Sequence, residues 1–154
     1  MKIRCLVVGK PRDADAAALH DRYAARVRRL GAAYETIWVP EVRQGGRFSD
    51  QHVREREARL LEAQLGDRGA VIALDGRGRP LTSEQLSRRL PGWARREATF
   101  VVGGPLGLDR ALLDRADWIW TLSSLTFPHE LSRVILAEQL YRALTLVRGV
   151  PYHK

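Results

Sequence analysis

The segment "AVIALDG", residues 70–76, reads most clearly as a buried strand. An almost unbroken apolar run of this length is typical of a strand in a parallel sheet, because such a strand is buried on both faces. It runs into "DGRGRP", whose glycines and proline predict a turn. The elements on either side of this strand are predicted from the same kind of pattern.

Short apolar runs alternate with amphipathic segments along the rest of the chain. Further strands are expected over 2–9, 34–42, 98–104 and 118–123, and helices over about 19–30, 49–65, from 82, over 108–116 and over 130–148. This alternation predicts an α/β fold with a mostly parallel sheet flanked by helices. A length of 154 residues is typical of one domain, so we expect a single domain over 1–154.

The last expected helix carries a wide apolar arc. Glu138, Arg142 and Thr145 form one narrow polar stripe, and apolar side chains occupy most of the remaining circumference. Such a helix has more surface to bury than one sheet face covers. We therefore expect it to pack against its own sheet and against a second subunit, as a homodimer. The alternative is a helix enclosed within one domain.

The composition favours a polyanionic partner. The formal net charge is +8, and clustered cations gain affinity for nucleic acid by releasing counterions. A general bias toward arginine is the competing explanation, since 23 of the 26 basic residues are arginine. The chain shows no leader and no apolar run of membrane-spanning length, so a cytoplasmic protein is expected. The single cysteine, Cys5, is expected to be a small buried hydrophobe.

Three loops follow expected strands and form the candidate site. They are "LDGRG" after the third strand, "GGPLG" after the fourth and "LSSLTFPH" after the fifth. In open α/β sheets ligands bind beyond the carboxyl ends of the strands, where glycines let the backbone approach them. The dinucleotide fingerprint, Walker A and the G-x-S-x-G elbow are all missing. No histidines or cysteines have metal-ligand spacing, and no metal is expected.

This pattern favours chemistry that a cofactor brings with it. A sulfonium methyl donor is already electrophilic, so a protein that uses one mainly has to hold donor and acceptor in line. Shaped backbone loops with few ionisable groups are sufficient for that task.

Two stretches resemble one known family. "FVVGGPLGL" at 100–108 and "LSSLTFPHELSRVILAEQLYRALTLVRGVPYHK" at 122–154 are similar to the SPOUT-class ribosomal RNA large subunit methyltransferase H family. The resemblance implies methylation of N3 of a pseudouridine in 23S ribosomal RNA, with S-adenosyl-L-methionine as methyl donor and a homodimer as the active form. It also implies a SPOUT-type fold with a C-terminal trefoil knot.

The resemblance also implies a set of site residues. Those expected to bind the cofactor lie in the same three loops and are Leu74, Gly103, Leu122, Ser123, Ser124, Leu125, Thr126 and Phe127. Those expected to contact RNA are Arg142, Tyr152, His153 and Lys154.

For the reaction itself, Arg142 or a charged His153 is expected to favour the anion of the imide, as an electrostatic and positioning group. The tail is expected to act in a cleft shared by two subunits. Two rival functions remain at this point: RNA binding without chemistry, and a SPOUT enzyme acting on transfer RNA.

Overall fold

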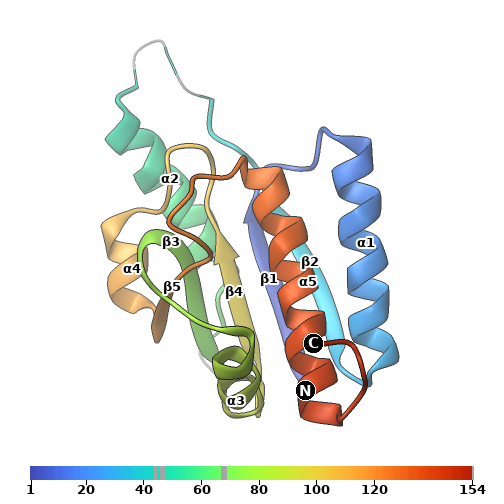
Figure 1. Ribbon diagram of the computed structural model, residues 1–154. Coiled ribbons are helices and arrows are strands. Elements are labelled where there is room, and N and C mark those ends of the chain that lie inside the picture. Colours follow the sequence, from blue (N-terminus) through green and yellow to red (C-terminus); the bar gives the residue numbers. More distant parts are fainter. Residues whose placement is uncertain (44, 46–47, 67–68, 154) are drawn as a thin grey trace.

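The computed structural model describes residues 1–43, 45, 48–66 and 69–153. Its sheet has five parallel strands in the order β2-β1-β4-β3-β5 (Figure 1). The strands are β1 (Lys2–Val8), β2 (Ala33–Val39), β3 (Ala70–Pro80), β4 (Ala98–Val102) and β5 (Trp118–Thr121). The helices are α1 (Ala14–Arg29), α2 (Asp50–Glu62), α3 (Ser83–Trp93), α4 (Arg110–Arg115) and α5 (His129–Arg148). The expected parallel α/β sheet with flanking helices is confirmed.

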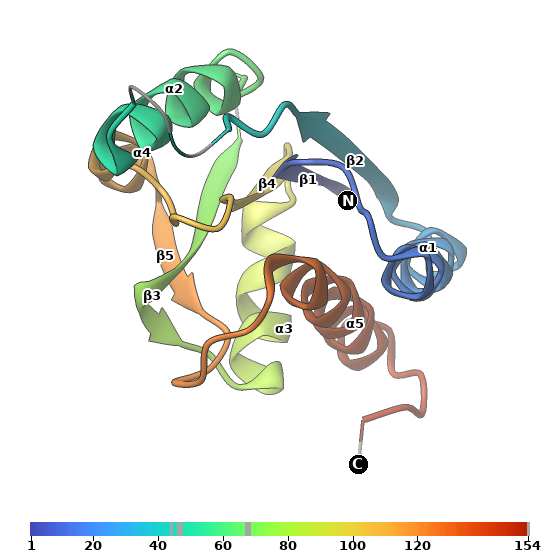
Figure 2. The ribbon, with the colours of Figure 1, turned by 90° about the horizontal axis from the view of Figure 1, so that it is seen from above.

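The helices cover both faces of the sheet. α2 and α4 lie on one face, and α1, α3 and α5 lie on the other (Figure 2). Side chains alternate along β1, so Cys5 and Val7 enter the core under α1, α3 and α5, whereas Leu6 and Val8 enter the core under α2 and α4. Burial of central strands on both faces explains their continuous apolar runs.

The turn expected at "DGRGRP" is wrong, because β3 continues to Pro80. After a shift of register, Arg79 and Pro80 pair with Trp120 and Thr121 of β5. A Cβ on Gly78 would lie 2.5 Å from the carbonyl oxygen of Ile119, so this glycine permits close approach of two backbones. β3 therefore continues past Leu74, the residue at which its pairing with β4 stops.

Local signals at helix ends were mostly correct. Thr82 caps α3 in a capping box with Gln85, and Ser49 caps α2. α5 ends at Arg148, where the sequence predicts its end, three residues before Pro151. Gly149 terminates it in a left-handed conformation with φ 65°, which glycine adopts without steric cost.

The apolar arc of α5 is largely buried inside the chain. α5 packs against α1 on one side and α3 on the other, and Leu136, Leu140 and Leu144 are fully covered. Thr145, expected in the polar stripe, is also buried, and its hydroxyl donates a hydrogen bond to the carbonyl of Arg142. The width of the arc therefore fits the enclosed-helix alternative and gives no argument for a second subunit.

Cys5 is 1% exposed, as expected for a core residue. Burial raises the pKa of its thiol to about 12, although the contact with the Tyr34 hydroxyl opposes the shift. In the part of the chain that the structure describes, no helix combines the length and apolarity needed to span a membrane.

Candidate functional site

A cavity of about 720 Å³ lies at the carboxyl ends of β3, β4 and β5. This volume falls in the range of roughly 300–1,000 Å³ that is typical of small-molecule sites. The cavity is lined by Leu74, Asp75, Gly76, Pro80, Val102, Gly103, Gly104, Pro105, Gly107, Trp120, Thr121, Leu122, Ser123, Ser124, Leu125, Thr126, Phe127, His129 and Ser132.

All eight residues expected to bind a cofactor line this one cavity. They come from three segments that are far apart in the chain: Leu74 from β3, Gly103 from the end of β4, and 122–127 from the segment between β5 and α5. A parallel sheet explains this convergence, because the carboxyl ends of its strands meet at one edge.

Five lining residues lie outside the three expected loops: Pro80, Val102, Trp120, Thr121 and Ser132. Pro80 was placed in a turn, and its role depends on the extension of β3. Trp120 was read only as a strand residue, although it lies directly before the loop that begins at Leu122. Ser132 reaches the cavity because α5 starts beside it, which no local signal indicates.

The glycine loop after β4 is packed too tightly for side chains. A Cβ on Gly103 would lie 2.9 Å from Leu108 Cδ2 and 3.1 Å from the backbone of Gly107. A Cβ on Gly104 would lie 2.9 Å from the carboxylate of Glu57. Because any side chain would displace these neighbours, the two glycines keep the backbone close to the cavity.

The segment after β5 is organised by short hydrogen bonds. The Thr121 hydroxyl donates to the carbonyl of Ser123 at 2.9 Å, and the Ser123 hydroxyl accepts from the amide of Leu125 at 3.0 Å. These bonds agree with the expectation that a serine in this loop bonds to the backbone. They turn the chain so that Leu125 projects outward, 71% exposed.

Asp75 and His129 are the ionisable residues among those that line the cavity. Burial would raise the pKa of Asp75, but hydrogen bonds from Arg77 outweigh burial and hold this pKa below its usual value. Arg77 also donates to the carbonyl of Leu108 and so ties the β3 extension to the loop before α4. Burial, assisted by Arg133, lowers the pKa of His129 and favours its neutral form.

The C-terminal tail is docked on α5 and α3. The Tyr152 hydroxyl donates to the carboxylate of Glu138 at 3.1 Å, and its ring packs on Tyr141. The Arg142 guanidinium lies 4.8 Å from the centre of the Tyr152 ring and donates to Glu138 at 2.6 Å. The tail is therefore held in place, as expected. The prediction for Lys154 concerns a residue outside the described part of the chain.

The structure does not bring the tail to the cavity of its own chain. None of Arg142, Tyr152 and His153 lines the cavity. Arg142 follows His129 by thirteen residues of one helix, which corresponds to about 20 Å along the axis. The expected site residues thus form two separate groups.

Two other kinds of site were considered. A cavity of about 150 Å³ between α1 and α5, lined in part by His20, Trp38 and Arg133, is smaller than the roughly 300 Å³ of an ordinary small-molecule site. Among residues 1–43, 45, 48–66 and 69–153 there is no group of three histidine, cysteine, aspartate or glutamate side chains that would hold a metal ion.

Comparison with known proteins identifies the family. Residues 1–153 match the family model described as "Predicted SPOUT methyltransferase". The chain is 42% identical over 156 residues to ribosomal RNA large subunit methyltransferase H of Anaeromyxobacter sp. (strain Fw109-5), with all of both chains covered. It is 43% identical over 157 residues to the protein of the same name from Thioalkalivibrio sulfidiphilus (strain HL-EbGR7), covering 100% of this chain and 99% of that one.

A solved structure supports the fold independently. The probable methylase family protein from Haemophilus influenzae Rd KW20 superposes with a TM-score of 0.57 at 11% sequence identity, over 99% of this chain and 70% of that one. At this level of identity the likeness concerns the fold alone. The full-length relatives and the family model together show that this chain belongs to the SPOUT methyltransferases of the ribosomal RNA large subunit methyltransferase H family.

Proposed function

We propose that this protein transfers a methyl group from S-adenosyl-L-methionine to N3 of a pseudouridine in 23S ribosomal RNA. The observation that carries the proposal is the 720 Å³ cavity, which gathers all eight expected cofactor residues at three strand ends in a chain of this family. Family membership supplies the reaction, and the cavity supplies a place for the donor.

The lining of the cavity fits this cofactor. Leu74, Leu122 and Phe127 provide apolar walls for the adenine, and residues 103–104 and 122–127 line the same cavity with backbone amides and carbonyls that suit the adenine edge. Trp120 contributes an indole nitrogen that is buried without a hydrogen-bond partner in the described chain. The mainly apolar lining leaves a cationic sulfonium without competing cations nearby.

The bound cofactor supplies an electrophilic methyl group. The protein has to hold the pseudouridine in line with that methyl group and to favour loss of the N3 proton to solvent. The electron pair left on N3 would then form the bond to the methyl carbon while the carbon–sulfur bond breaks, with S-adenosylhomocysteine as the leaving group. Arg142 is suited to stabilise the resulting imide anion, since its pKa is raised by the hydrogen bond to Glu138 and it stays charged. His153 is the second candidate for this electrostatic and positioning role.

The separation of the two groups supports a homodimer. The cavity and the tail of one chain lie apart, so a site that uses both needs the cavity of one subunit and the tail of its partner. Leu125 and Leu131, beside the cavity, are 71% and 44% exposed and offer an apolar surface to a second copy. The active site then lies in the cleft between subunits, and each dimer contains two such sites.

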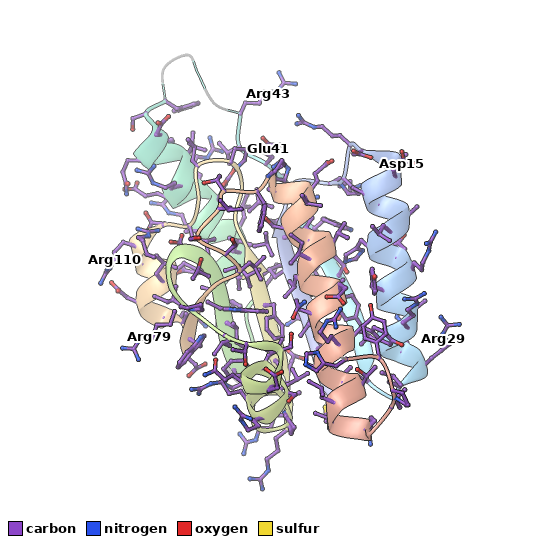
Figure 3. All side chains as sticks on the ribbon, viewed as in Figure 1. Asp15, Arg29, Glu41, Arg43, Arg79 and Arg110 are labelled. Carbon is purple, nitrogen blue, oxygen red and sulfur yellow. The ribbon has the colours of Figure 1, made fainter. Side chains whose placement is uncertain are left out.

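The surface charge suits a ribosomal RNA substrate. Arg43 and Arg79 are exposed and project outward from the molecule (Figure 3). Tyr152 and His153, together with Arg142, add an aromatic ring and cationic groups that suit a base and its phosphates. Because the substrate is ribosomal, we place the protein in the cytoplasm.

The SPOUT-type trefoil knot is part of the same proposal, within a single domain of residues 1–154. Two features support it. β5 pairs with both Leu74 and the 79–80 extension of β3, and α5 then packs against α3, which follows that extension directly. An experimentally determined structure that traces 74–82 and 122–129 decides whether the chain passes through this loop.

Methyl transfer is tested on purified substrates. We expect 23S ribosomal RNA from cells that lack the enzyme to gain one methyl group on a pseudouridine after incubation with protein and cofactor, measured by mass spectrometry of nucleosides. Comparing naked RNA, large subunits and whole ribosomes identifies the form that is accepted. RNA binding without methylation, and without a cofactor-dependent rise in melting temperature, would support the binding-only rival. Methylation of transfer RNA would support the other rival.

The shared site is tested by mixing two impaired variants, at a cofactor concentration that saturates wild type but not Gly103→Ala. Gly103→Ala damages the cavity, and Arg142→Ala damages the tail. In heterodimers one of the two sites combines an intact cavity with an intact tail, so a fully exchanged mixture should recover about a quarter of wild-type activity. A mixture that stays inactive although subunit exchange is demonstrated would show that each site is built from one chain.

A further inference from the structure

Glu84 connects α3 to the C-terminal tail. It lies in the first turn of α3, and its Oε1 is 2.8 Å from Nε2 of His153. We infer that Glu84 is the positioning residue that orients His153 for the reaction, an inference that rests on the proposed function. Glu84 is not among the site residues that the family resemblance implies, and it does not line the cofactor cavity.

The first turn of α3, which carries Glu84, is firmly held. Thr82 and Gln85 form the capping box that starts α3, and the Ser83 hydroxyl donates to Gln139 of α5 at 2.8 Å. Contact with Thr82, the helix backbone and His153 lowers the pKa of Glu84 to about 2. The carboxylate is therefore charged under all working conditions, and it projects from an element that is packed against α5.

The contact determines how the imidazole is presented. Because Nε2 faces a carboxylate, the neutral ring carries its proton on Nε2, and this N–H donates a hydrogen bond to Glu84. Nδ1 therefore keeps its lone pair. Nδ1 is buried and has no hydrogen-bond partner in the described chain. A buried lone pair is tolerated better than a buried N–H without an acceptor, which agrees with this tautomer. In the cationic ring Glu84 stabilises the charge, so both forms keep one orientation.

The two tail residues thus have separate acidic partners. Tyr152 is held by Glu138 of α5, which also binds Arg142, whereas His153 is held by Glu84 of α3. Because the anchors belong to different helices, the His153 contact can be removed without disturbing the Glu138 cluster. This separation makes the role of Glu84 testable.

The experiment compares Glu84→Gln with wild type on ribosomal substrate. We expect kcat to fall by about 5- to 20-fold. A positioned acid–base or electrostatic group accelerates a reaction by about 10²–10⁴-fold, and a misoriented group loses part of that acceleration. The dissociation constant for S-adenosylmethionine should be unchanged. The ¹⁵N signals of the His153 imidazole should shift toward a mixture of tautomers. In a His153→Ala background Glu84→Gln should have no further effect on kcat.

Asp15→Asn is the matched control. Asp15 lies in the first turn of α1 (Figure 3), so its replacement removes the same charge from a helix N-terminus away from the tail. It should leave kcat and the His153 signals unchanged. The inference fails if Glu84→Gln retains full kcat with wild-type imidazole signals, or if it lowers kcat equally without His153. Neither result touches the proposed function, which fails only if the wild-type protein does not methylate.

Discussion

The cofactor cavity and the C-terminal tail are built in different ways. The cavity is made of backbone and apolar side chains, and its shape follows from the carboxyl ends of three adjacent strands. The tail is held by charged and aromatic side chains, with Glu84 and Glu138 as its acidic anchors. The shape of the cavity thus depends on the packing of backbone and apolar side chains, and the position of the tail depends on charged contacts.

This difference separates binding from turnover. A change of volume in the cavity should weaken binding of the cofactor. A change of charge in the tail should lower kcat while the cofactor still binds.

Arg142→Ala should produce the largest loss. Removing a cation that stabilises the developing anion should lower kcat by roughly 10²–10³, the usual effect of losing one such group. The affinity for S-adenosylmethionine, measured by calorimetry, should change little because Arg142 does not line the cavity. Arg110→Ala is the control, since Arg110 also pairs with an acid four residues later on a helix. Equal losses in both variants would contradict a specific role for Arg142.

Gly103→Ala should act mainly on cofactor affinity. The added Cβ meets Leu108 at 2.9 Å and the Gly107 backbone at 3.1 Å, so the loop must move. Overpacking costs about 1–3 kcal/mol of stability. If the loop relieves this strain by moving into the cavity, and binding has to reverse that movement, affinity falls by up to roughly 150-fold. Gly92→Ala is the control, because its Cβ would meet nothing within 4 Å. Unchanged calorimetric affinity in Gly103→Ala would show that the loop does not contact the cofactor.

Thr82→Ala should affect both stability and the tail. Loss of the N-cap of α3 should reduce the free energy of unfolding by about 1 kcal/mol, measured by urea denaturation. It should also lower kcat slightly, because α3 carries Glu84. Ser49→Ala removes the N-cap of α2 and should reduce stability alone. If both variants show the same kcat, the position of the tail does not depend on the start of α3.

Asp75→Asn should have the smallest effect of the four substitutions, and its effect on stability should depend on pH. Arg77 is more than half exposed, so its ion pair with Asp75 should contribute no more than about 1 kcal/mol. The folded pKa of Asp75 lies below its unfolded value, so this stability is present above the unfolded value and is lost as pH falls through the folded one. Thermal melts should show wild type more stable than the variant at neutral pH and the difference vanishing in acid. A constant difference would exclude the charge as its cause.

Local patterns predicted most elements and the membership of the cavity. Strand runs, the start of a helix at about Ser49, the cap at Thr82 and the core position of Cys5 all depend on nearby residues, and all were confirmed. The turn at 75–80 was wrong because a glycine, here Gly78, also allows two backbones to approach. The apolar arc of α5 left two alternatives open, because periodicity indicates how much of a helix is buried and not which element covers it.

The sequence by itself determined the α/β class, the parallel sheet, the family and the three loops that line the cavity, since these follow from short-range patterns and from motifs with fixed spacing. Only the tertiary structure decided that β3 extends to Pro80, that α1 and α3 enclose α5, and that Glu84 meets His153. Each of these is a contact between segments far apart in the chain, and its energy depends on distances that arise only after the sheet and helices have packed.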